Sequence, residues 1–315
     1  MNFPEPLAYG KAAQELNKVM SACELCPRKC GVNRLWNNGF CGTGVNAQVN
    51  LYQLHFGEEP PISGVNGSGT VFFSGCTLSC AFCQNHQIST SHERSQQVGA
   101  WEMAEIFMAL QEKGAHNINL VSPTPHLVVI LKALLLARED GLTLPVVYNT
   151  SGYEKLSTLQ ALAGLVDIYL PDYKYYDAAK AKSLSGAEDY PRAARMALEE
   201  MLAQVGHLEL DEKGVAVRGL LVRHLVLPNN LSDTPKVLNS IADICGTDTW
   251  VSLMSQYTPL HQAAMVPGLE RAITQEEYDA ACRAFDNAGL HNGFVQELSS
   301  TGNDFIPSFK SEHNL

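Results

Sequence analysis

The sequence lacks the long apolar run and the basic excess that would direct a chain to a membrane or to nucleic acid. Its longest apolar segment, residues 127–137, is interrupted by Lys132. It is shorter than the ~20 residues that span a bilayer, so we expect a core helix there. Lys and Arg number 22 against 33 Asp and Glu, a net charge of −11, which argues against a nucleic-acid partner. The 45% hydrophobic content of the 315 residues predicts a globular protein with a sizeable core.

The amino-terminal residues contain no apolar targeting segment, so we expect a cytoplasmic protein with no membrane partner. In a reducing compartment, cysteines are expected to bind metals or lie in the core, and not to form disulfides. Of the nine cysteines, Cys245 and Cys282 are most simply core residues, and the others fall in two short groups. These two groups are the first candidates for function.

The first group follows a short apolar strand that ends at Gly75. Cys76, Cys80 and Cys83 come next, with the spacing C-x3-C-x2-C. A pair of zinc knuckles would need two separated C-x2-C units and four ligands. Three thiolates on one loop instead suit three corners of a [4Fe–4S] cluster and leave one iron open for a small molecule. The spacing therefore predicts a [4Fe–4S] cluster at this loop.

The second group lies nearer the amino terminus and consists of Cys23, Cys26, Cys30 and Cys41. Glycine follows two of these cysteines directly, which permits tight turns with backbone N–H groups directed at sulfur. Four thiolates predict a closed metal site. Structural zinc, which is slightly favoured, and a complete second [4Fe–4S] cluster both remain open.

Strand-like and helix-like segments alternate from residue 69 onward. Strands are expected at 70–74, 117–121, 145–149, 167–170, 218–227 and 250–255, and helices at about 98–113, 125–140, 154–163, 177–204, 234–245 and 275–289. This alternation, with strands apolar on both faces, favours a parallel sheet with right-handed crossovers. We predict an α/β fold with two parts. Residues 69–315 are expected to form a partial (β/α)6 TIM-like barrel with a C-terminal helix. Residues 1–68 are expected to form a small extension that contains a helix at 11–22, the metal-binding cysteines, a strand from residue 47 and a loop.

Polar or turn-forming residues follow each expected strand, and the carboxyl ends of barrel strands are where chemistry gathers. Arg223 lies inside an apolar strand, so it needs an anionic partner. The adjacent His224 should face the other way and be structural. Glu58 and Glu59 lie in the loop before the first barrel strand, where we expect them to be solvated.

The three-cysteine spacing with Phe82 before the last cysteine, C-x3-C-x-aromatic-C, resembles the signature of the radical SAM superfamily. The resemblance implies that the open iron binds S-adenosylmethionine (SAM). It also implies that an electron from the cluster cleaves the sulfonium to give a 5′-deoxyadenosyl radical for hydrogen abstraction. Within that superfamily the chain is similar to the pyruvate formate-lyase activating enzyme group. The segments that carry this similarity are 83–85, 148–152, 171–174 and 222–228.

Two segments depart from that group's pattern. Its Gly-Gly-Glu motif after the second strand is replaced here by Ser122-Pro-Thr124-Pro-His126, and its histidine after the sixth strand is replaced by Ser255-Gln256-Tyr257. The N-terminal cysteines are also extra. The chain is therefore most similar to an activating-enzyme-like subgroup with an additional four-cysteine motif.

The resemblance implies roles for particular residues. Arg223 and Lys174 are the expected catalytic residues, and SAM contacts are expected from Ser122, Thr124, Asn149, Ser151, Asp172, Lys174 and Arg223. A flavodoxin or ferredoxin is the expected reductant, and a protein whose glycine becomes a radical is one expected substrate. Two alternatives stay open: a radical SAM enzyme acting on a small molecule or in methyl transfer, and an Fe–S electron-transfer protein without SAM chemistry.

Overall fold

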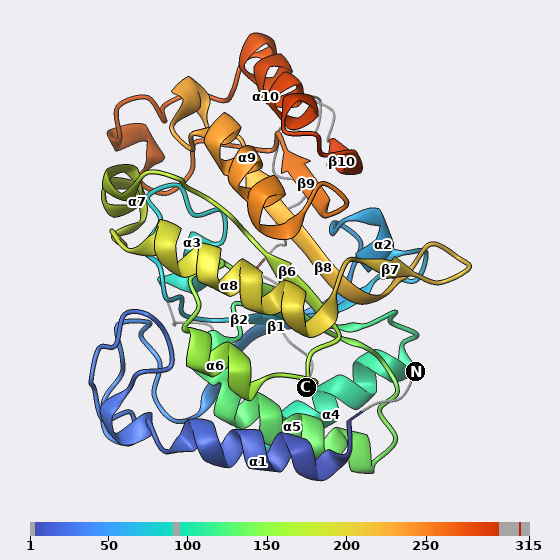
Figure 1. The fold of residues 1–315 in the computed structure, drawn as a ribbon. Helices are drawn as coiled ribbons and strands as arrows, with labels where there is room; N and C mark the ends of the chain where they lie inside the picture. The colour runs from blue at the N-terminus through green and yellow to red at the C-terminus, as the bar shows by residue number, and fades with distance from the viewer. Residues whose placement is uncertain (1–3, 91–94, 296–308, 310–315) are drawn as a thin grey trace.

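A ten-stranded mixed sheet forms the centre of the protein (Figure 1). The structure, a computed structural model, describes residues 4–90, 95–295 and 309. The end of the expected second domain therefore lies outside the described residues. The strands are β1 (Ala47–His55), β2 (Ser68–Phe73), β3 (Gln96–Val98), β4 (Ile118–Val121), β5 (Val146–Thr150), β6 (Ile168–Pro171), β7 (Glu209–Leu210), β8 (Ala216–Leu225), β9 (Trp250–Met254) and β10 (Asn292–Val295).

The strand order along the sheet is β10-β9-β8-β6-β5-β4-β2-β1-β3, with β7 paired to β8. Strands β2, β4, β5, β6, β8, β9 and β10 are mutually parallel, while β1 and β3 are antiparallel to their neighbours. All six expected barrel strands are present, and the α/β class is confirmed. Among the described residues the sheet is not closed, and β3 and β10 stand at the two ends of the strand order.

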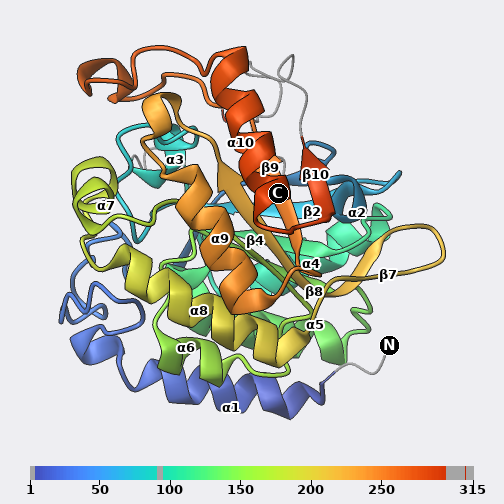
Figure 2. The same ribbon diagram turned by 45° about the horizontal axis from the view of Figure 1, so that its top comes forward.

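Ten α-helices are described: α1 (Pro6–Asn17), α2 (Pro60–Ser63), α3 (His86–Ser89), α4 (Ala100–Glu112), α5 (Leu127–Glu139), α6 (Leu156–Ala161), α7 (Ala178–Ser185), α8 (Tyr190–Val205), α9 (Thr234–Cys245) and α10 (Gln275–Asn287). Because parallel neighbours follow one another in chain order, right-handed crossovers place the connecting helices on one face of the sheet. Figure 2 shows α8, α9 and α10 following one another across this face. Helix α1 forms an outer layer by packing along α5.

Two helix predictions need correction. The segment 177–204 is not one helix, because Gly186 adopts a left-handed conformation (φ 64°) that ends α7, and Pro191 then stands in the first turn of α8. The helix expected at 11–22 begins at Pro6 and ends at Asn17, with a short 3₁₀ turn at 20–22. The expected division after residue 68 falls at the first residue of β2, and β1 already belongs to the same sheet.

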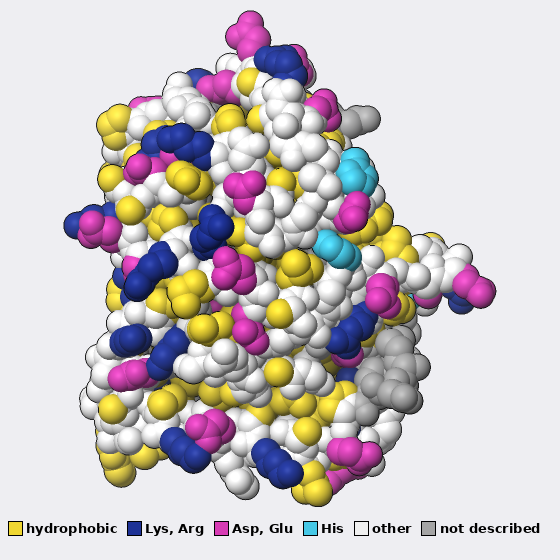
Figure 3. All heavy atoms as spheres, viewed as in Figure 1, with side chains coloured by type: hydrophobic (Ala, Val, Ile, Leu, Met, Phe, Trp, Pro, Cys, Tyr) yellow, Lys and Arg dark blue, Asp and Glu magenta, His cyan; other side chains and the backbone are white. Residues whose placement is uncertain are grey.

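The buried side chains of the sheet and helices form a large apolar core. Strand β2 is buried along its whole length, and so are β4, β5 and β6. Cys245 lies in this core as expected, whereas Cys282 is only partly buried on α10. None of the described helices is long and apolar enough to cross a membrane. On the face seen in Figure 3, side chains of both charge signs are interspersed.

Candidate active site

The loop that carries Cys76, Cys80 and Cys83, hereafter the three-cysteine loop (residues 76–83), leaves the carboxyl end of β2 at a sharp turn. Gly75 makes that turn with φ 90°, a conformation that favours glycine. The far part of the loop is held by α7, because the Ala81 N–H donates to the Leu184 carbonyl at 2.8 Å. Phe82 is buried edge-on against Tyr175 and Tyr257. The loop is thus fixed at both ends.

Each sulfur of this loop has a hydrogen-bond neighbour. The Leu78 N–H donates to the Cys76 sulfur at 3.4 Å, and the Ser185 hydroxyl donates to the Cys80 sulfur at 2.9 Å. Burial raises the pKa of Cys76 to about 12 and that of Cys83 to about 11, with mutual repulsion as a further cause. As thiolates these groups need a compensating cation, which is what a metal ion or cluster supplies.

All three cysteines line one cavity of about 420 Å³. This size lies within the range of small-molecule sites. Among the described residues, no three Cys, His, Asp or Glu side chains already converge on one metal position. A cysteine side chain has a single χ angle with three staggered rotamers, and the donor set of three thiols on a tight loop suits a cubane cluster with one open iron.

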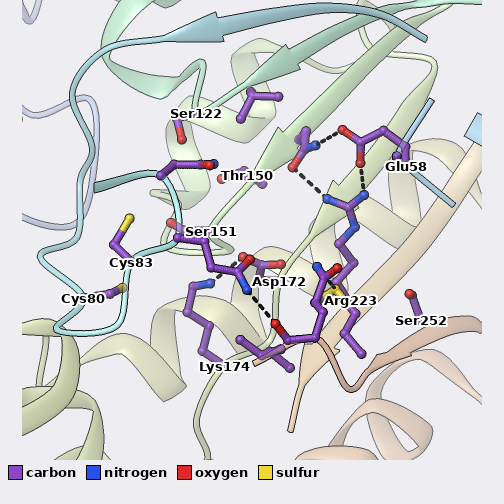
Figure 4. Close-up of a pocket in the computed structure, with 18 of the residues that line it drawn as sticks. Glu58, Cys80, Cys83, Ser122, Thr150, Ser151, Asp172, Lys174, Arg223 and Ser252 are labelled. Atoms are coloured by element: carbon purple, nitrogen blue, oxygen red, sulfur yellow. Dashed lines mark hydrogen bonds and ion pairs between the residues drawn. The ribbon is translucent and has the colours of Figure 1, made fainter. Parts of the chain in front are cut away.

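The carboxyl ends of the parallel strands line the same cavity (Figure 4). The predicted residues that the structure brings together there are Ser122 after β4, Asn149 and Ser151 at the end of β5, Asp172 and Lys174 after β6, and Arg223 on β8. Thr150, which was not predicted, also lines the cavity. Ser122 has φ 60°, an uncommon conformation for a residue with a side chain and one that clusters at functional sites.

Lys174 and Asp172 form an ion pair at 2.5 Å, with side chains only 18% and 24% exposed. Burial acts to lower the pKa of Lys174, but Asp172 and Cys80 outweigh it and raise the pKa above its usual value. Tyr190 on α8 holds this corner: its hydroxyl accepts the Lys174 N–H at 2.9 Å and donates to the Asp172 carbonyl at 3.0 Å. Lys174 is therefore a fixed cation close to the three-cysteine loop.

Arg223 spans the other side of the cavity and binds two carboxylates. Its Nε donates to Glu59 at 2.8 Å, and its terminal nitrogen pairs with both Glu58 and Glu59. Burial acts to raise the pKa of Glu59, but Arg223 outweighs it and holds the pKa below its usual value. Asn149 donates to Glu58 and accepts from Arg223, each at 3.4 Å. These contacts make a closed charge network at the cavity wall (Figure 4).

The chain has a clear relative among curated proteins, although no protein-family model matches it. That relative is a Methanocaldococcus jannaschii protein named "Uncharacterized protein MJ0674", 31% identical over 299 residues, or 92% of this chain and 82% of the relative. The chain belongs to the family of this archaeal protein. The match covers 92% of the chain, so the family relationship extends over most of its length.

Similar solved structures include two larger proteins. One is the crystal structure of Streptococcus suis SuiB bound to S-adenosylmethionine, with a TM-score of 0.47, 13% identity and 70% of this chain aligned. The other is HydG, a maturase of the [FeFe]-hydrogenase, with a TM-score of 0.44, 11% identity and 72% of this chain aligned. In both cases the alignment spans 48% of the other protein, so the chain covers about half the length of these structures.

Glu58 and Glu59 correct the sequence analysis, which placed them in solvent. Their side chains are only 8% and 6% exposed, because the loop before β2 turns them inward onto Arg223. A signal for this existed in the sequence. An arginine inside an apolar strand requires an anionic partner, and two consecutive glutamates before Pro60-Pro61 were available to supply it. What the sequence did not indicate is which carboxylates would reach it.

Thr124 is the one predicted SAM contact that the structure keeps away from the cavity. It begins the turn into α5 and is 3% exposed. Its hydroxyl donates to the buried Glu154 at 2.7 Å and lies 3.1 Å from the Tyr148 hydroxyl. Burial raises the pKa of Glu154 to about 7. Thr124 therefore belongs to a buried network behind the cavity wall.

His224 is fully buried on the opposite side of β8 from Arg223, as strand alternation predicts. Its ring nitrogens lie 2.7 Å from the Tyr173 carbonyl and 3.0 Å from the Thr234 hydroxyl. Burial lowers the pKa of His224 to about 4, so the ring is neutral at physiological pH. This agrees with the structural role expected for it.

Cys23, Cys26, Cys30 and Cys41, hereafter the N-terminal cysteine set, border a second, much smaller cavity of about 10 Å³. Burial raises the pKa of Cys26 to about 12. The pKa of Cys30 is lowered instead: burial acts to raise it, but N–H groups of Val32 and Phe40 outweigh this. Thr77 of the three-cysteine loop and Thr124 also border this cavity, so the two cysteine groups are close neighbours in space.

Proposed function

We propose that the protein is a radical SAM enzyme that cleaves S-adenosylmethionine reductively at a [4Fe–4S] cluster. The observation that carries the proposal is the position of C-x3-C-x2-C on the loop after β2, facing a cavity that is also lined by residues at the ends of the other parallel strands. Cys76, Cys80 and Cys83 would hold three irons and leave the fourth open. When bound, such a cluster supplies one electron to the SAM sulfonium, giving methionine and a 5′-deoxyadenosyl radical.

The charges of the cavity support a SAM-like ligand. Two cations, Lys174 and Arg223, line it together with three carboxylates, Glu58, Glu59 and Asp172, which leaves one negative charge. SAM carries a sulfonium, an ammonium and a carboxylate, a net charge of plus one, so ligand and cavity are complementary. Lys174 is placed to bind the carboxylate of the ligand, and Asp172 to accept from its ammonium or ribose hydroxyls.

The strand order supports the finer expectation of a partial (β/α)6 barrel. Strands β2, β4, β5, β6, β8 and β9 are parallel and adjacent in chain order, as in a barrel wall. A doubly wound sheet would reverse its order near the middle, and the ligand would bind at that reversal. Here the order of the parallel strands does not reverse, and the cavity is lined by the ends of successive strands.

Hydrogen abstraction from a glycine of a partner protein is the narrower proposal, and it follows from the resemblance to the pyruvate formate-lyase activating enzyme group. A flavodoxin or ferredoxin would supply the electron. A small-molecule substrate or methyl transfer is the alternative. The two differ in where the radical ends, because only the first leaves an EPR doublet on a partner protein.

Anaerobic reconstitution tests the proposal. The wild-type protein is loaded with iron and sulfide, reduced with dithionite and given SAM, and the products are separated by chromatography. Formation of 5′-deoxyadenosine and methionine, abolished in Cys80→Ala and retained in the core variant Cys245→Ser, is the expected result. An intact cluster that leaves SAM uncleaved, alone and with cell extract as a source of substrate, would instead favour an Fe–S electron-transfer protein.

A further inference from the structure

Arg34 is a buried cation beside the N-terminal cysteine set. The residue is 2% exposed, and its terminal nitrogen donates to the Thr43 hydroxyl and the Gly44 carbonyl, both at 2.6 Å. Its Nε is buried without a hydrogen-bond partner among the described residues. No carboxylate in the described part of the chain forms an ion pair with this guanidinium. A buried charge of this kind requires an anion close by.

The sulfurs supply the missing anion once they bind a metal. The Arg34 charge acts directly on the sulfurs of Cys23 and Cys30. Backbone N–H groups two residues further along the chain are directed at three of the sulfurs: Leu25 at Cys23, Arg28 at Cys26 and Val32 at Cys30. The Thr43 hydroxyl lies 3.1 Å from the Cys41 sulfur. Each of the four sulfurs therefore faces at least one donor from which a metal-bound thiolate can accept.

The size of the cavity favours one ion over a cubane cluster. The cavity among the cysteines measures about 10 Å³, roughly the space of one water-sized sphere, whereas an eight-atom [4Fe–4S] core needs several times more. At Gly39, a side chain would place its Cβ 3.4 Å from the Cys41 sulfur and 3.5 Å from the Cys30 sulfur. These are ordinary van der Waals distances, and they show that the sulfurs of Cys30 and Cys41 flank the same glycine.

The N-terminal cysteine set is also tied to the three-cysteine loop through one side chain. Arg28, whose N–H faces the Cys26 sulfur, donates from its Nε to the Thr77 carbonyl at 2.9 Å. Its other nitrogens donate to the carbonyls of Ser185 and Gly186. The Ser185 hydroxyl in turn donates to the Cys80 sulfur. A conformational change at the N-terminal cysteines would therefore reach the three-cysteine loop directly.

We propose that the N-terminal cysteine set binds one zinc ion as a tetrathiolate, with Arg34 as its buried counter-charge and Arg28 as its link to the three-cysteine loop. Binding replaces four S–H bonds by four Zn–S bonds and releases the four protons to solvent, without any redox change. The complex carries two negative charges, one of which Arg34 offsets. The assignment of the zinc site does not depend on the proposed function. The link from that site to the catalytic cluster does rest on the proposed function.

Metal analysis of protein purified without oxygen tests the zinc site. We expect about one zinc, four irons and four sulfides per chain after reconstitution. Cys26→Ser should lose the zinc, while Cys282→Ser, which removes a partly buried thiol elsewhere, should keep it. About eight irons and no zinc, or one additional iron without sulfide, would each overturn the assignment. Zinc in a protein that cleaves no SAM would uphold this site and refute only the proposed function.

Two arginine variants test the two roles. Arg34→Met removes the charge at similar volume, so a competing chelator should extract zinc at about 10- to 100-fold lower concentration. Arg34→Lys keeps the charge, so its zinc affinity should stay near that of the wild type. Equal zinc affinity in the wild type, Arg34→Met and Arg34→Lys would refute the role of Arg34 as counter-charge. Arg28→Met should keep its zinc but lose cluster iron to a chelator several-fold faster than the exposed-residue control Arg192→Met. An unchanged rate of iron loss would refute the link.

Discussion

Replacing Arg223 by methionine tests the charge network on the cavity wall. The variant leaves Glu58 and Glu59 buried side by side, with exposed fractions of 8% and 6%, and without their cation. Removing one member of a buried ion pair costs about 3–5 kcal/mol, because the remaining charge is neither solvated nor paired. We expect the free energy of unfolding at pH 7.5 to fall by that amount. Arg218→Met, which removes an exposed arginine from the same strand, should cost less than about 1 kcal/mol.

The pH dependence has a definite sign. In the wild type, Arg223 holds the pKa of Glu59 below its usual 4.5, so this contribution to stability is present above pH 4.5 and is lost as the pH falls through the lowered value. Without Arg223, burial acts alone and raises the pKa of Glu59. The variant then gains stability as it takes up a proton toward acid pH. The difference between the two proteins should therefore be largest at pH 7.5 and smaller at pH 5.

Guanidinium unfolding of the metal-free protein, followed by circular dichroism under reducing conditions, measures both effects. Adding Glu58→Gln and Glu59→Gln to Arg223→Met removes the unpaired charges and should recover most of the lost stability. The reasoning is refuted if Arg223→Met is no less stable than Arg218→Met at pH 7.5. It is also refuted if the stability loss is the same at pH 5 as at pH 7.5.

Three further predictions concern the cysteine loop, the buried network and the strand-end turn. Cys80→Ala should lose the iron of the three-cysteine loop but keep the metal of the N-terminal cysteine set, as elemental analysis would show. Burial raises the pKa of Glu154 to about 7, so the wild type should lose stability as the pH rises through 7, whereas the stability of Glu154→Gln should not show this loss. Denaturant unfolding at pH 6 and pH 8 compares the two proteins. The same change in stability in both would contradict the assignment. Gly152→Ala and Gly164→Ala both introduce a side chain at φ 76°, which costs about 1–2 kcal/mol, but only at Gly152 would the Cβ lie 2.2 Å from the Asp172 carbonyl oxygen. Gly152→Ala should therefore melt at a clearly lower temperature than Gly164→Ala, and it should bind SAM more weakly in equilibrium dialysis. Equal melting temperatures would rule out the contact.

Local patterns in the sequence were enough to predict β1, the six strands of the parallel core and most of the longer helices, whereas β3, β7 and β10 were not predicted. Apolar runs and the residues that end them act over a few positions, so the six expected strands match β2, β4, β5, β6, β8 and β9 closely. The carboxyl ends of parallel strands meet at one edge, so the shared cavity also followed from the strand assignments. The prediction of one helix at 177–204 was wrong for a local reason, because Gly186 in its left-handed conformation ends α7.

The sequence by itself determined the three-cysteine loop, the strand–helix alternation and the need of Arg223 for an anion. Only the tertiary structure decided which side chains meet. Glu58 and Arg223 lie 165 positions apart, and their pairing depends on how the loop before β2 folds over the sheet. Thr124 turns away from the cavity because Ser122, at φ 60°, redirects the chain into α5. Arg28 reaches Thr77 because the N-terminal cysteine segment folds back against α6 and the three-cysteine loop. Such contacts arise from the packing of distant segments, which short-range periodicity does not encode.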